Sequence, residues 1–575
     1  MKLFLIGHRG VGKSSLLGRL KNYFPDVTCL CLDEEIENRT GRSIKDIFTN
    51  EGEATFRKFE QKFLGEILEE SSGETLALAL GAGFQGELPK GAEVLWLQRG
   101  MDSSRSLFLD RPNLASGLAL PPERFEERQK RYSEMATREL ELPPSLEASD
   151  EAEKLYFAKY FQIPVANQAR GHWVCTLLPT HQKESLNDLF ELTDCRFEIR
   201  DDLLDDETIA NLKGIAFPTV FSLRDPNKIQ ESLELVDEFD QWDWPLEWGG
   251  QRAPIQSLHQ RKESLLETLN DLEKVEGLCK LAVPIDNFNE LKLGWDWWQE
   301  SPTSRVFLPS SINGRWSWFR LLMAQAMPFS FFREGRGSSP DQPLLLDVLN
   351  FQPQLSRWAA ILGSPVRHSL TPSHHRLFFR SRQANTLAVD MSAEEWDEAL
   401  PLLSEWGLHW AAVTSPLKSK AASTLGSRNS SLNTLVNIDG VWQGHSTDGQ
   451  GLKIAVEKFL GKKVAVWGGG GTLETIQEVF PSASFYSSRT GKLKMGEPQL
   501  SPEVILWAVG REAFDSEGVF PPKEWRPERV IDLNYTQDSP GILCAYNYGC
   551  QYQDGLAMFL GQAQGQQEFW KNYDK

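Results

Sequence analysis

The feature that most constrains this chain is a glycine-rich loop set between a buried strand and a helix near residue 1. Residues 2–6 are apolar enough for a buried strand, and they run into Gly7-His-Arg-Gly10-Val-Gly12-Lys13-Ser14-Ser15. This run fits the pattern GxxxxGK[ST] in the strand–loop–helix setting that the pattern requires. Such glycines let backbone N–H groups curve around phosphate oxygens, and the helix N-terminus adds a positive dipole. We therefore predict an ATP site in which Lys13 reaches the β- and γ-phosphates and Ser14 coordinates Mg²⁺.

Length and charge indicate a protein of several domains and argue against two classes of partner. The chain has 575 residues, more than one hydrophobic core supports. Its net charge of -19 argues against a nucleic-acid partner or a membrane surface. The longest apolar run, 76–84, is far shorter than the roughly 20 residues that span a bilayer. The 7 cysteines show no metal-ligand spacing, so we expect a reduced, cytoplasmic protein.

Two breaks in composition, near 160–170 and 350–357, divide the chain into three segments. We assign them to 1–165, 168–350 and 355–575. All three alternate short β-branched runs with amphipathic helical stretches, which predicts an α/β multidomain protein.

The first segment carries further motifs in fixed order: Asp33 before Glu-Glu-Ile, Phe-Arg57-Lys-Phe-Glu, Gly81-Ala-Gly83, Arg111-Pro-Asn-Leu, and Arg128 before Tyr132. This series resembles shikimate kinase along the whole segment. The resemblance implies that shikimate is held by Asp33, Arg57, Arg128 and the backbone of Gly81 and Gly83, and that Arg111 stabilises the transferring phosphoryl group from a lid. Guanidinium forks suit a carboxylate, and an aspartate suits a hydroxyl. Cys31 stands where the family usually has an aspartate near the metal.

The middle segment contains eight short strand-like runs, at 172–178, 195–200, 218–224, 242–248, 255–259, 279–284, 305–309 and 328–332. Eight strand–helix repeats predict a closed parallel barrel with its chemistry at the carboxyl ends of the strands. Only residues 249–254 join the fourth and fifth runs, which is too short for a crossover helix. We therefore expect a barrel with one helix missing.

Lys280 lies in Cys-Lys-Leu-Ala-Val, where its ammonium would be buried among apolar neighbours. Burial lowers a lysine pKa and makes the neutral amine nucleophilic, and His259 could then transfer protons. The alternative is a structural ion pair between Lys280 and Glu198 or Glu247. The residues alone leave both readings open.

This pattern resembles type I 3-dehydroquinate dehydratase. The resemblance implies that Lys280 forms a Schiff base and that His259 is the acid/base. It also implies a substrate-binding set of Glu198, Arg200, Arg224, Arg320 and Gln342. Lys228 stands about where the family has a glutamate or glutamine that supports the histidine.

In the third segment a strand at 463–467 runs into the four-glycine turn 468–471 and a helix. Such a turn can cradle a pyrophosphate, although a lone glycine-rich loop leaves other turns open. The next strand ends at Ser-Ser-Arg489-Thr490, and an arginine there suits the 2′-phosphate of NADP.

These blocks resemble shikimate dehydrogenase across the segment, with a substrate lobe (355–455), an NADP lobe (456–545) and C-terminal helices that return to the substrate lobe. The resemblance implies a catalytic pair, Lys418 and Asp448. It implies a shikimate-binding set of Ser369, Thr371, Thr414, Asn433 and Gln562, and an NADP-binding set of Gly468, Gly470, Gly471, Arg489 and Thr490. As isolated residues, Lys418 and Asp448 would more often be a surface pair. The cluster of His368, His374 and His375 favours a structural role over a metal site, because no third spaced ligand accompanies it.

The order kinase, dehydratase, dehydrogenase is similar to the C-terminal part of the fungal pentafunctional arom polypeptides. The resemblance implies conversion of 3-dehydroquinate to 3-dehydroshikimate, then to shikimate, then to shikimate 3-phosphate, with ATP, Mg²⁺ and NADP(H). Two alternatives stay open. In the first, an active kinase and an active dehydrogenase flank a barrel that is inactive or only binds. In the second, the protein is a regulator similar to the quinate repressor. A homo-oligomer stays open.

Overall fold

The computed structural model describes residues 1–99, 122–145, 150–163, 172–181, 183–250, 252–353, 355–469, 472–510, 514–515, 518–535 and 539–573. Within these ranges the chain forms two compact units, one before residue 354 and one after it. No helix of the described ranges combines the length and apolar character that crossing a bilayer requires.

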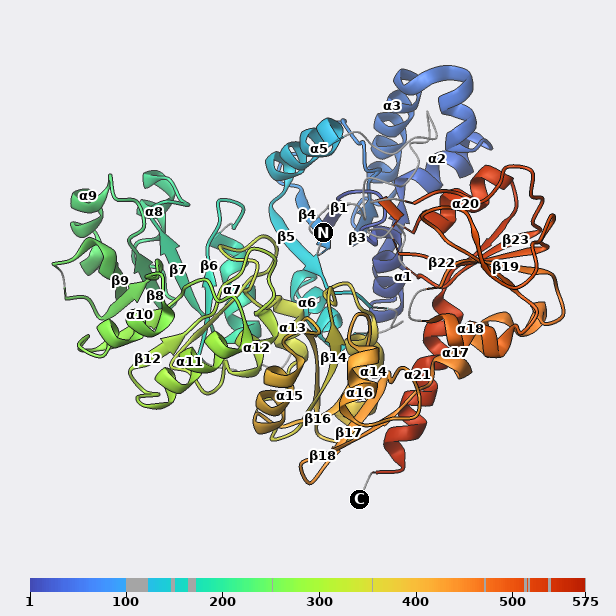
Figure 1. Cartoon of the computed structure of the whole chain (residues 1–575). Coiled ribbons are helices and arrows are strands. Elements are labelled where there is room, and N and C mark those ends of the chain that lie inside the picture. The colour runs from blue at the N-terminus through green and yellow to red at the C-terminus, as the bar shows by residue number, and fades with distance from the viewer. Residues whose placement is uncertain are drawn as a thin grey trace. The chain divides into compact units, whose positions relative to one another are not determined.

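The first unit opens with a five-stranded parallel sheet in the order β2-β3-β1-β4-β5. Its elements are β1 (Lys2–Ile6), α1 (Lys13–Tyr23), β2 (Thr28–Cys31), α2 (Leu32–Thr40), α3 (Ile44–Glu70), β3 (Leu76–Ala79), β4 (Glu93–Arg99), α5 (Pro122–Met135), β5 (Arg138–Leu142) and α6 (Glu151–Tyr160) (Figure 1). The predicted strand over residues 2–6 is therefore confirmed.

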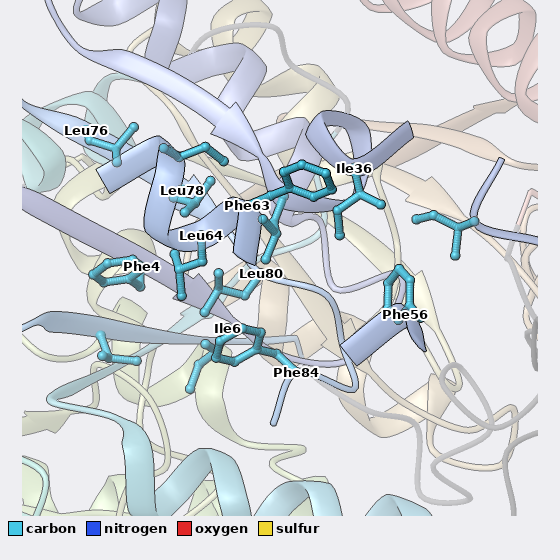
Figure 2. Close-up of a cluster of buried hydrophobic side chains, with 14 of the residues drawn as sticks. Phe4, Ile6, Ile36, Phe56, Phe63, Leu64, Leu76, Leu78, Leu80 and Phe84 are labelled. Atoms are coloured by element: carbon cyan, nitrogen blue, oxygen red, sulfur yellow. The ribbon is translucent and has the colours of Figure 1, made fainter. Parts of the chain in front are cut away.

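A hydrophobic cluster fixes this sheet against α3 (Figure 2). Phe4 and Ile6 lie two residues apart in β1 and therefore point to the same face of the sheet. They belong to one buried cluster with Phe63 and Leu64 of α3, and all four side chains are at most 6% exposed. Burying each such side chain contributes roughly 1.5–3 kcal/mol. The packing holds β1 rigidly, so the loop that follows Ile6 begins from a fixed strand end.

The same unit continues into an eight-stranded sheet in the order β12-β11-β10-β9-β8-β7-β6-β13, with every pair parallel. Its strands are β6 (Trp173–Thr176), β7 (Arg196–Arg200), β8 (Thr219–Ser222), β9 (Gln241–Pro245), β10 (Ile255–Leu258), β11 (Leu278–Leu281), β12 (Arg305–Phe307) and β13 (Ser330–Phe332). Its helices are α7 (Lys183–Thr193), α8 (Asp206–Leu212), α9 (Ile229–Leu233), η1 (Val236–Glu238), η2 (Leu246–Trp248), α10 (Leu265–Leu272), α11 (Phe288–Gln299), α12 (Ser317–Leu322) and α13 (Leu345–Asn350).

All eight predicted strands are present in one parallel sheet, and β12 and β13 are its two edges. The described residues between β9 and β10 form only the short helix η2, in agreement with the missing crossover helix. The carboxyl ends of the strands lie on one side of the sheet because all the strands are parallel.

The second unit contains two sheets. The first has the order β15-β14-β16-β17-β18 and the second β21-β20-β19-β22-β23-β24. The strands are β14 (Trp358–Gly363), β15 (Asn385–Asp390), β16 (Leu408–Val413), β17 (Thr434–Ile438), β18 (Val441–His445), β19 (Val464–Gly468), β20 (Ser484–Tyr486), β21 (Leu493–Met495), β22 (Val504–Ala508), β23 (Arg529–Asp532) and β24 (Gln551–Gln553). The helices are α14 (Thr371–Arg380), α15 (Trp396–Glu405), α16 (Lys418–Thr424), α17 (Asp448–Val456), η3 (Glu457–Phe459), α18 (Leu473–Val479), α20 (Pro540–Tyr548) and α21 (Leu556–Lys571).

Helix α21 returns to the first of these sheets. Trp570 near its end is buried and donates a hydrogen bond to the carbonyl oxygen of Leu435 in β17, at 2.9 Å. The same helix packs against α17. It therefore brings residues near the C-terminus to the end of the sheet where α16 and α17 begin.

Candidate active sites

The glycine-rich loop has the backbone conformation of a phosphate cradle. Gly7, Gly10 and Gly12 have φ values of 141°, 87° and 105°, a region that side chains disfavour. A Cβ atom on Gly7 would lie 2.6 Å from the carbonyl oxygen of Leu97. The loop therefore depends on glycine at these positions, and its residues fit a nucleotide phosphate.

Lys13 begins α1, and its side chain folds back over this loop. Its Nζ donates to the carbonyl oxygens of Gly7, at 2.7 Å, and His8, at 3.1 Å. The ammonium is thus held at the cradle by backbone acceptors. Ser14 and Ser15 follow in the first turn of the helix, where a serine hydroxyl can coordinate Mg²⁺.

The five residues predicted to hold shikimate lie together. A Cβ on Gly81 would be 2.9 Å from Oδ1 of Asp33, and one on Gly83 would be 2.6 Å from a guanidinium nitrogen of Arg57 and 3.4 Å from one of Arg128. The bare backbone of the loop after β3 therefore leaves room between one carboxylate and two guanidinium groups. Arg111 lies outside the described residues.

Glu60 is a buried member of this site that the sequence reasoning missed. Arg57 donates to Glu60 at 2.6 Å, and burial raises the pKa of Glu60 to about 7 although Arg57 opposes the shift. In the described part of the chain, Oδ1 of Asp33, Oε1 of Glu60 and Nε of Arg57 are buried without a hydrogen-bond partner. Such atoms call for a polar ligand. The signal was the spacing of three between Arg57 and Glu60 on a helix.

Lys280 of the eight-stranded sheet is buried and paired with Asp243, a residue that the sequence reasoning did not single out. The Lys280 side chain is 3% exposed and that of Asp243 1%. Lys280 therefore does form an ion pair, as the alternative interpretation had it, but with Asp243 and not with Glu198 or Glu247. Asp243 also pairs with Arg224, so two cations share one carboxylate.

The environment of Lys280 favours loss of its proton. Burial lowers the pKa of Lys280, while Asp243 opposes this shift. Burial and the charges of Arg224 and Lys280 hold the pKa of His259 well below its usual range. A ring nitrogen of His259 lies 3.0 Å from Oγ of Ser257. The site therefore combines a lysine and a histidine whose pKa values both lie below their usual range.

The other carboxylates of the barrel have different roles. Glu198 accepts hydrogen bonds from Thr176 and Ser222, both at 2.7 Å. Glu247 accepts from the backbone N–H of His259 at 2.5 Å. Glu247 therefore fixes the backbone that carries the histidine.

Gln342 is linked to Glu198 through Thr176. Nε2 of Gln342 donates to Oγ1 of Thr176 at 3.4 Å and to Oγ of Ser338 at 3.0 Å. Thr176 in turn donates to Glu198. The structure thus brings two predicted substrate residues into one hydrogen-bonded group.

Three basic residues of the barrel have other partners. Arg200 donates to Asp202 at 2.6 Å. Arg320 donates to the carbonyl oxygens of Pro309 and Leu308, at 2.9 and 3.2 Å, and burial lowers its pKa to about 10. Lys228 donates to Asp206 at 3.1 Å.

The most complete of the predicted groups surrounds Asp448. Lys418 at the start of α16 donates to both oxygens of Asp448 at 2.8 Å. Asn433 donates to Oδ1 at 2.9 Å, and Gln562 of α21 donates to the same atom at 2.6 Å. Asp448 is 1% exposed and Lys418 is 21% exposed, so the two do not form the surface pair that such residues form more often in isolation.

The remaining predicted substrate residues of this unit lie near the ends of the first sheet. Ser369 and Thr371 are buried at the start of α14, and Oγ of Ser369 accepts from the backbone N–H of Thr371 at 3.2 Å. Tyr535, which sequence reasoning did not assign, is near Ser369, and burial raises the pKa of its phenol while Ser369 opposes the shift. Thr414 follows β16, where its methyl group would be 2.3 Å from a Cβ on Gly363.

The turn after β19 fits a dinucleotide phosphate. Gly468 and Gly469 have φ values of 93° and 103°, and a Cβ on Gly468 would lie 2.4 Å from Val509. Gly470 and Gly471 lie outside the described residues. Arg489 and Thr490 are exposed after β20, which is the parallel neighbour of β19. Their place at the same sheet edge suits the ribose 2′-phosphate of NADP.

His375 is buried, and both of its ring nitrogens are hydrogen-bonded by side chains of α21. Nε2 lies 3.0 Å from Oε1 of Gln566, and Nδ1 accepts from Gln567 at 3.0 Å. Burial lowers its pKa to about 3. The neutral ring therefore ties α14 to α21.

Comparisons with known proteins identify relatives of two parts of the chain. A family profile described as shikimate kinase matches residues 9–142. A shikimate dehydrogenase (NADP(+)) from Thermococcus kodakarensis is 33% identical over 250 residues, which cover 38% of this chain and 92% of that relative. A bifunctional shikimate kinase/3-dehydroquinate synthase from Thermotoga maritima is 33% identical over 141 residues, 23% of this chain and 28% of the relative. The crystal structure of a shikimate 5-dehydrogenase from Thermus thermophilus with NADP(H) and shikimate superposes with a TM-score of 0.33 at 22% identity, covering 38% of this chain and 94% of that one.

Proposed function

The chain belongs to the shikimate dehydrogenase family and carries a shikimate kinase domain, and on this basis we propose that it is a trifunctional enzyme of the shikimate pathway. The proposed reactions are dehydration of 3-dehydroquinate, NADPH-dependent reduction of 3-dehydroshikimate and ATP-dependent phosphorylation of shikimate. The observation that carries the proposal is the hydrogen-bonded group that Lys418, Asn433 and Gln562 form around the buried Asp448.

In the dehydrogenase site, Lys418 is the proton donor for the carbonyl oxygen of 3-dehydroshikimate. NADPH supplies the hydride when it is bound. Asp448 keeps the Lys418 ammonium in place through two hydrogen bonds of 2.8 Å. Asn433 and Gln562 fix the orientation of this carboxylate, so the pair is organised before the substrate arrives.

In the kinase site, Arg57 and Arg128 bind the carboxylate of shikimate, and Asp33 accepts a hydrogen bond from a ring hydroxyl. ATP supplies the phosphoryl group when it is bound, together with Mg²⁺ held at Ser14. The buried, unpartnered oxygens of Asp33 and Glu60 support a substrate rich in hydroxyl groups, because each would otherwise stay without a donor in the described part of the chain.

In the barrel, the neutral amine of Lys280 adds to the ketone of 3-dehydroquinate and expels water, which forms an imine. The imine acidifies the neighbouring C–H bond, and His259 removes that proton. The hydroxyl group one carbon further takes up this proton from His259 and leaves as water, and the electrons of the broken C–H bond form the double bond. Hydrolysis of the imine then frees 3-dehydroshikimate and restores Lys280. The lowered pKa values of both residues support these roles.

Borohydride trapping with peptide mapping tests the barrel reaction. We expect 3-dehydroquinate and borohydride to leave a reduced adduct on Lys280. No adduct and no dehydration, beside intact NADP-dependent oxidation of shikimate, would identify a barrel that only binds.

A Lys13→Ala variant tests whether the kinase is a separate site. We expect it to lose shikimate phosphorylation and to keep dehydrogenase activity. Equal loss of both activities would contradict independent sites.

A further inference from the structure

The strand β5 at the edge of the kinase sheet is unusual because its charged residues are buried. Arg138, Glu139 and Glu141 are 5%, 3% and 7% exposed. Charged side chains at a sheet edge normally remain in water, and burying them is unfavourable unless each is paired. The ion-pair partners of all three belong to the barrel.

The covering segment follows β13 and runs over residues 333–336. Glu141 pairs with Arg333, Arg138 donates to Glu334 at 2.7 Å, and Arg336 donates to Glu139 at 2.5 Å.

The backbones of the two parts also meet. The N–H of Glu141 donates to the carbonyl oxygen of Glu334 at 2.8 Å. A Cβ on Gly335 would lie 2.3 Å from Cβ of Glu139, so the segment approaches β5 more closely than a side chain allows. The two parts are therefore joined in one fixed register.

The same segment leads directly into the barrel site. Nε of Arg333 donates to the carbonyl oxygen of Gln342 at 3.1 Å. The side chain of Gln342 then contacts Ser338 and Thr176, and Thr176 donates to Glu198. Arg333 thus contacts Glu141 on one side and Gln342 on the other.

Close packing keeps this connection short. A Cβ on Gly337 would lie 2.2 Å from Oε1 of Gln342 and 2.8 Å from Cδ of Arg333. The N–H of Leu345 donates to the carbonyl oxygen of Arg333 at 2.8 Å, which closes the loop that carries Gln342. A change at Arg333 therefore moves the backbone of Gln342.

We propose that Glu141 of the kinase part is a positioning residue for the dehydratase site of the barrel. It holds Arg333, and through Arg333 it holds the segment 333–342 that places Gln342 against the substrate. The proposal rests on the proposed dehydratase function. Lys280 lies in β11 and His259 directly follows β10, both outside this segment, so the effect of Glu141 falls on substrate binding rather than on the chemical steps.

The test is Glu141→Gln in the full chain, with kinetics of 3-dehydroquinate dehydration. Glutamine keeps the size of the side chain but leaves the buried Arg333 without its counter-charge. We expect the KM for 3-dehydroquinate to rise about tenfold and kcat to stay within about twofold. Glu70→Gln is the matched control, because Glu70 pairs with Arg39 in the kinase part but is 61% exposed. It should leave both constants unchanged.

Hydrogen exchange gives a second readout that needs no activity. In Glu141→Gln, peptides covering 338–345 should exchange faster, while peptides covering β11 should not change. An unchanged KM together with unchanged exchange overturns the positioning role, and so does an equal response in Glu70→Gln. If the wild-type chain forms no 3-dehydroshikimate, the dehydratase function is refuted, and with it the kinetic role of Glu141. Faster exchange then shows only that Glu141 holds the segment.

Discussion

Replacement of Lys418 by methionine separates the charge of its ammonium from the volume of its side chain. Asp448 would lose two hydrogen bonds of 2.8 Å and keep the amide donors of Asn433 and Gln562. Removing one partner of a buried ion pair lowers the free energy of unfolding by about 3–5 kcal/mol. Because Lys418 is 21% exposed, we expect a loss at the lower end of this range, about 3 kcal/mol. In shikimate oxidation, the reverse of the proposed reduction, Lys418 takes up the hydroxyl proton, and loss of such a positioned proton-transfer group slows a reaction about 10²- to 10⁴-fold. The kcat for shikimate oxidation should therefore fall at least about 100-fold.

The assay is the initial rate of NADPH formation from shikimate, with thermal unfolding as a check that the variant is folded. Lys420→Met is the matched control, because Lys420 lies in the same helix and pairs with Asp397 at 2.7 Å on the surface. It should change kcat by less than about twofold. A Lys418→Met variant that keeps more than about a tenth of the wild-type kcat would refute the assigned proton donor. Equal losses in the two variants would do the same.

Three further predictions concern the other sites. Burial raises the pKa of Glu60 to about 7, so its ionisation adds negative charge beside Arg57 and the kinase KM for shikimate should rise between about pH 6 and pH 8. Glu60→Gln should make that KM independent of pH, and a flat wild-type profile would contradict the ionisation. Burial lowers the pKa of Lys280, so borohydride trapping with 3-dehydroquinate should reach half its maximum below pH 10.5, and a midpoint at or above that value would reject the shift. Gly468→Ala should raise the KM for NADP at least about tenfold. Gly461→Ala is the control and should leave this KM unchanged, because Gly461 also has a positive φ of 90° but open space around it. Equal effects of the two variants would refute the phosphate-binding role of the turn after β19.

Local patterns predicted much of the fold. The strand at residues 2–6 and the eight strands of the middle segment are short apolar runs bounded by turn residues, and each is present. The phosphate loop was also predictable from local pattern. Its turn requires residues with positive φ, and the glycines stand at the positions that have such φ values. The group around Asp448 was different. Its members come from separate parts of the second unit, and family resemblance rather than spacing brought them together.

The partner of Lys280 could not be predicted from local pattern. Asp243 lies on β9 and Lys280 on β11, and β10 stands between them. Asp243 is level with Ile255 of β10, but Lys280 is level with Ser257, two residues further on. The pairing depends on the stagger of the barrel strands, through which alternate strands contribute to one interior layer. A sequence does not reveal that stagger.

The burial of β5 was hidden for a similar reason. Arg138, Glu139 and Glu141 look like a solvated edge, because their partners follow about two hundred residues later in the chain. Arg138 and Glu334 are 196 positions apart. Complementary charges on two segments become informative only when the fold has brought the segments together.

Incubation of the purified chain with 3-dehydroquinate, NADPH, ATP and Mg²⁺ tests most directly whether one polypeptide carries all three reactions. We predict that shikimate 3-phosphate accumulates, with equal consumption of NADPH and ATP. If 3-dehydroquinate stays unchanged while added 3-dehydroshikimate is converted to shikimate 3-phosphate, the barrel is not a dehydratase and the proposed trifunctional enzyme is contradicted.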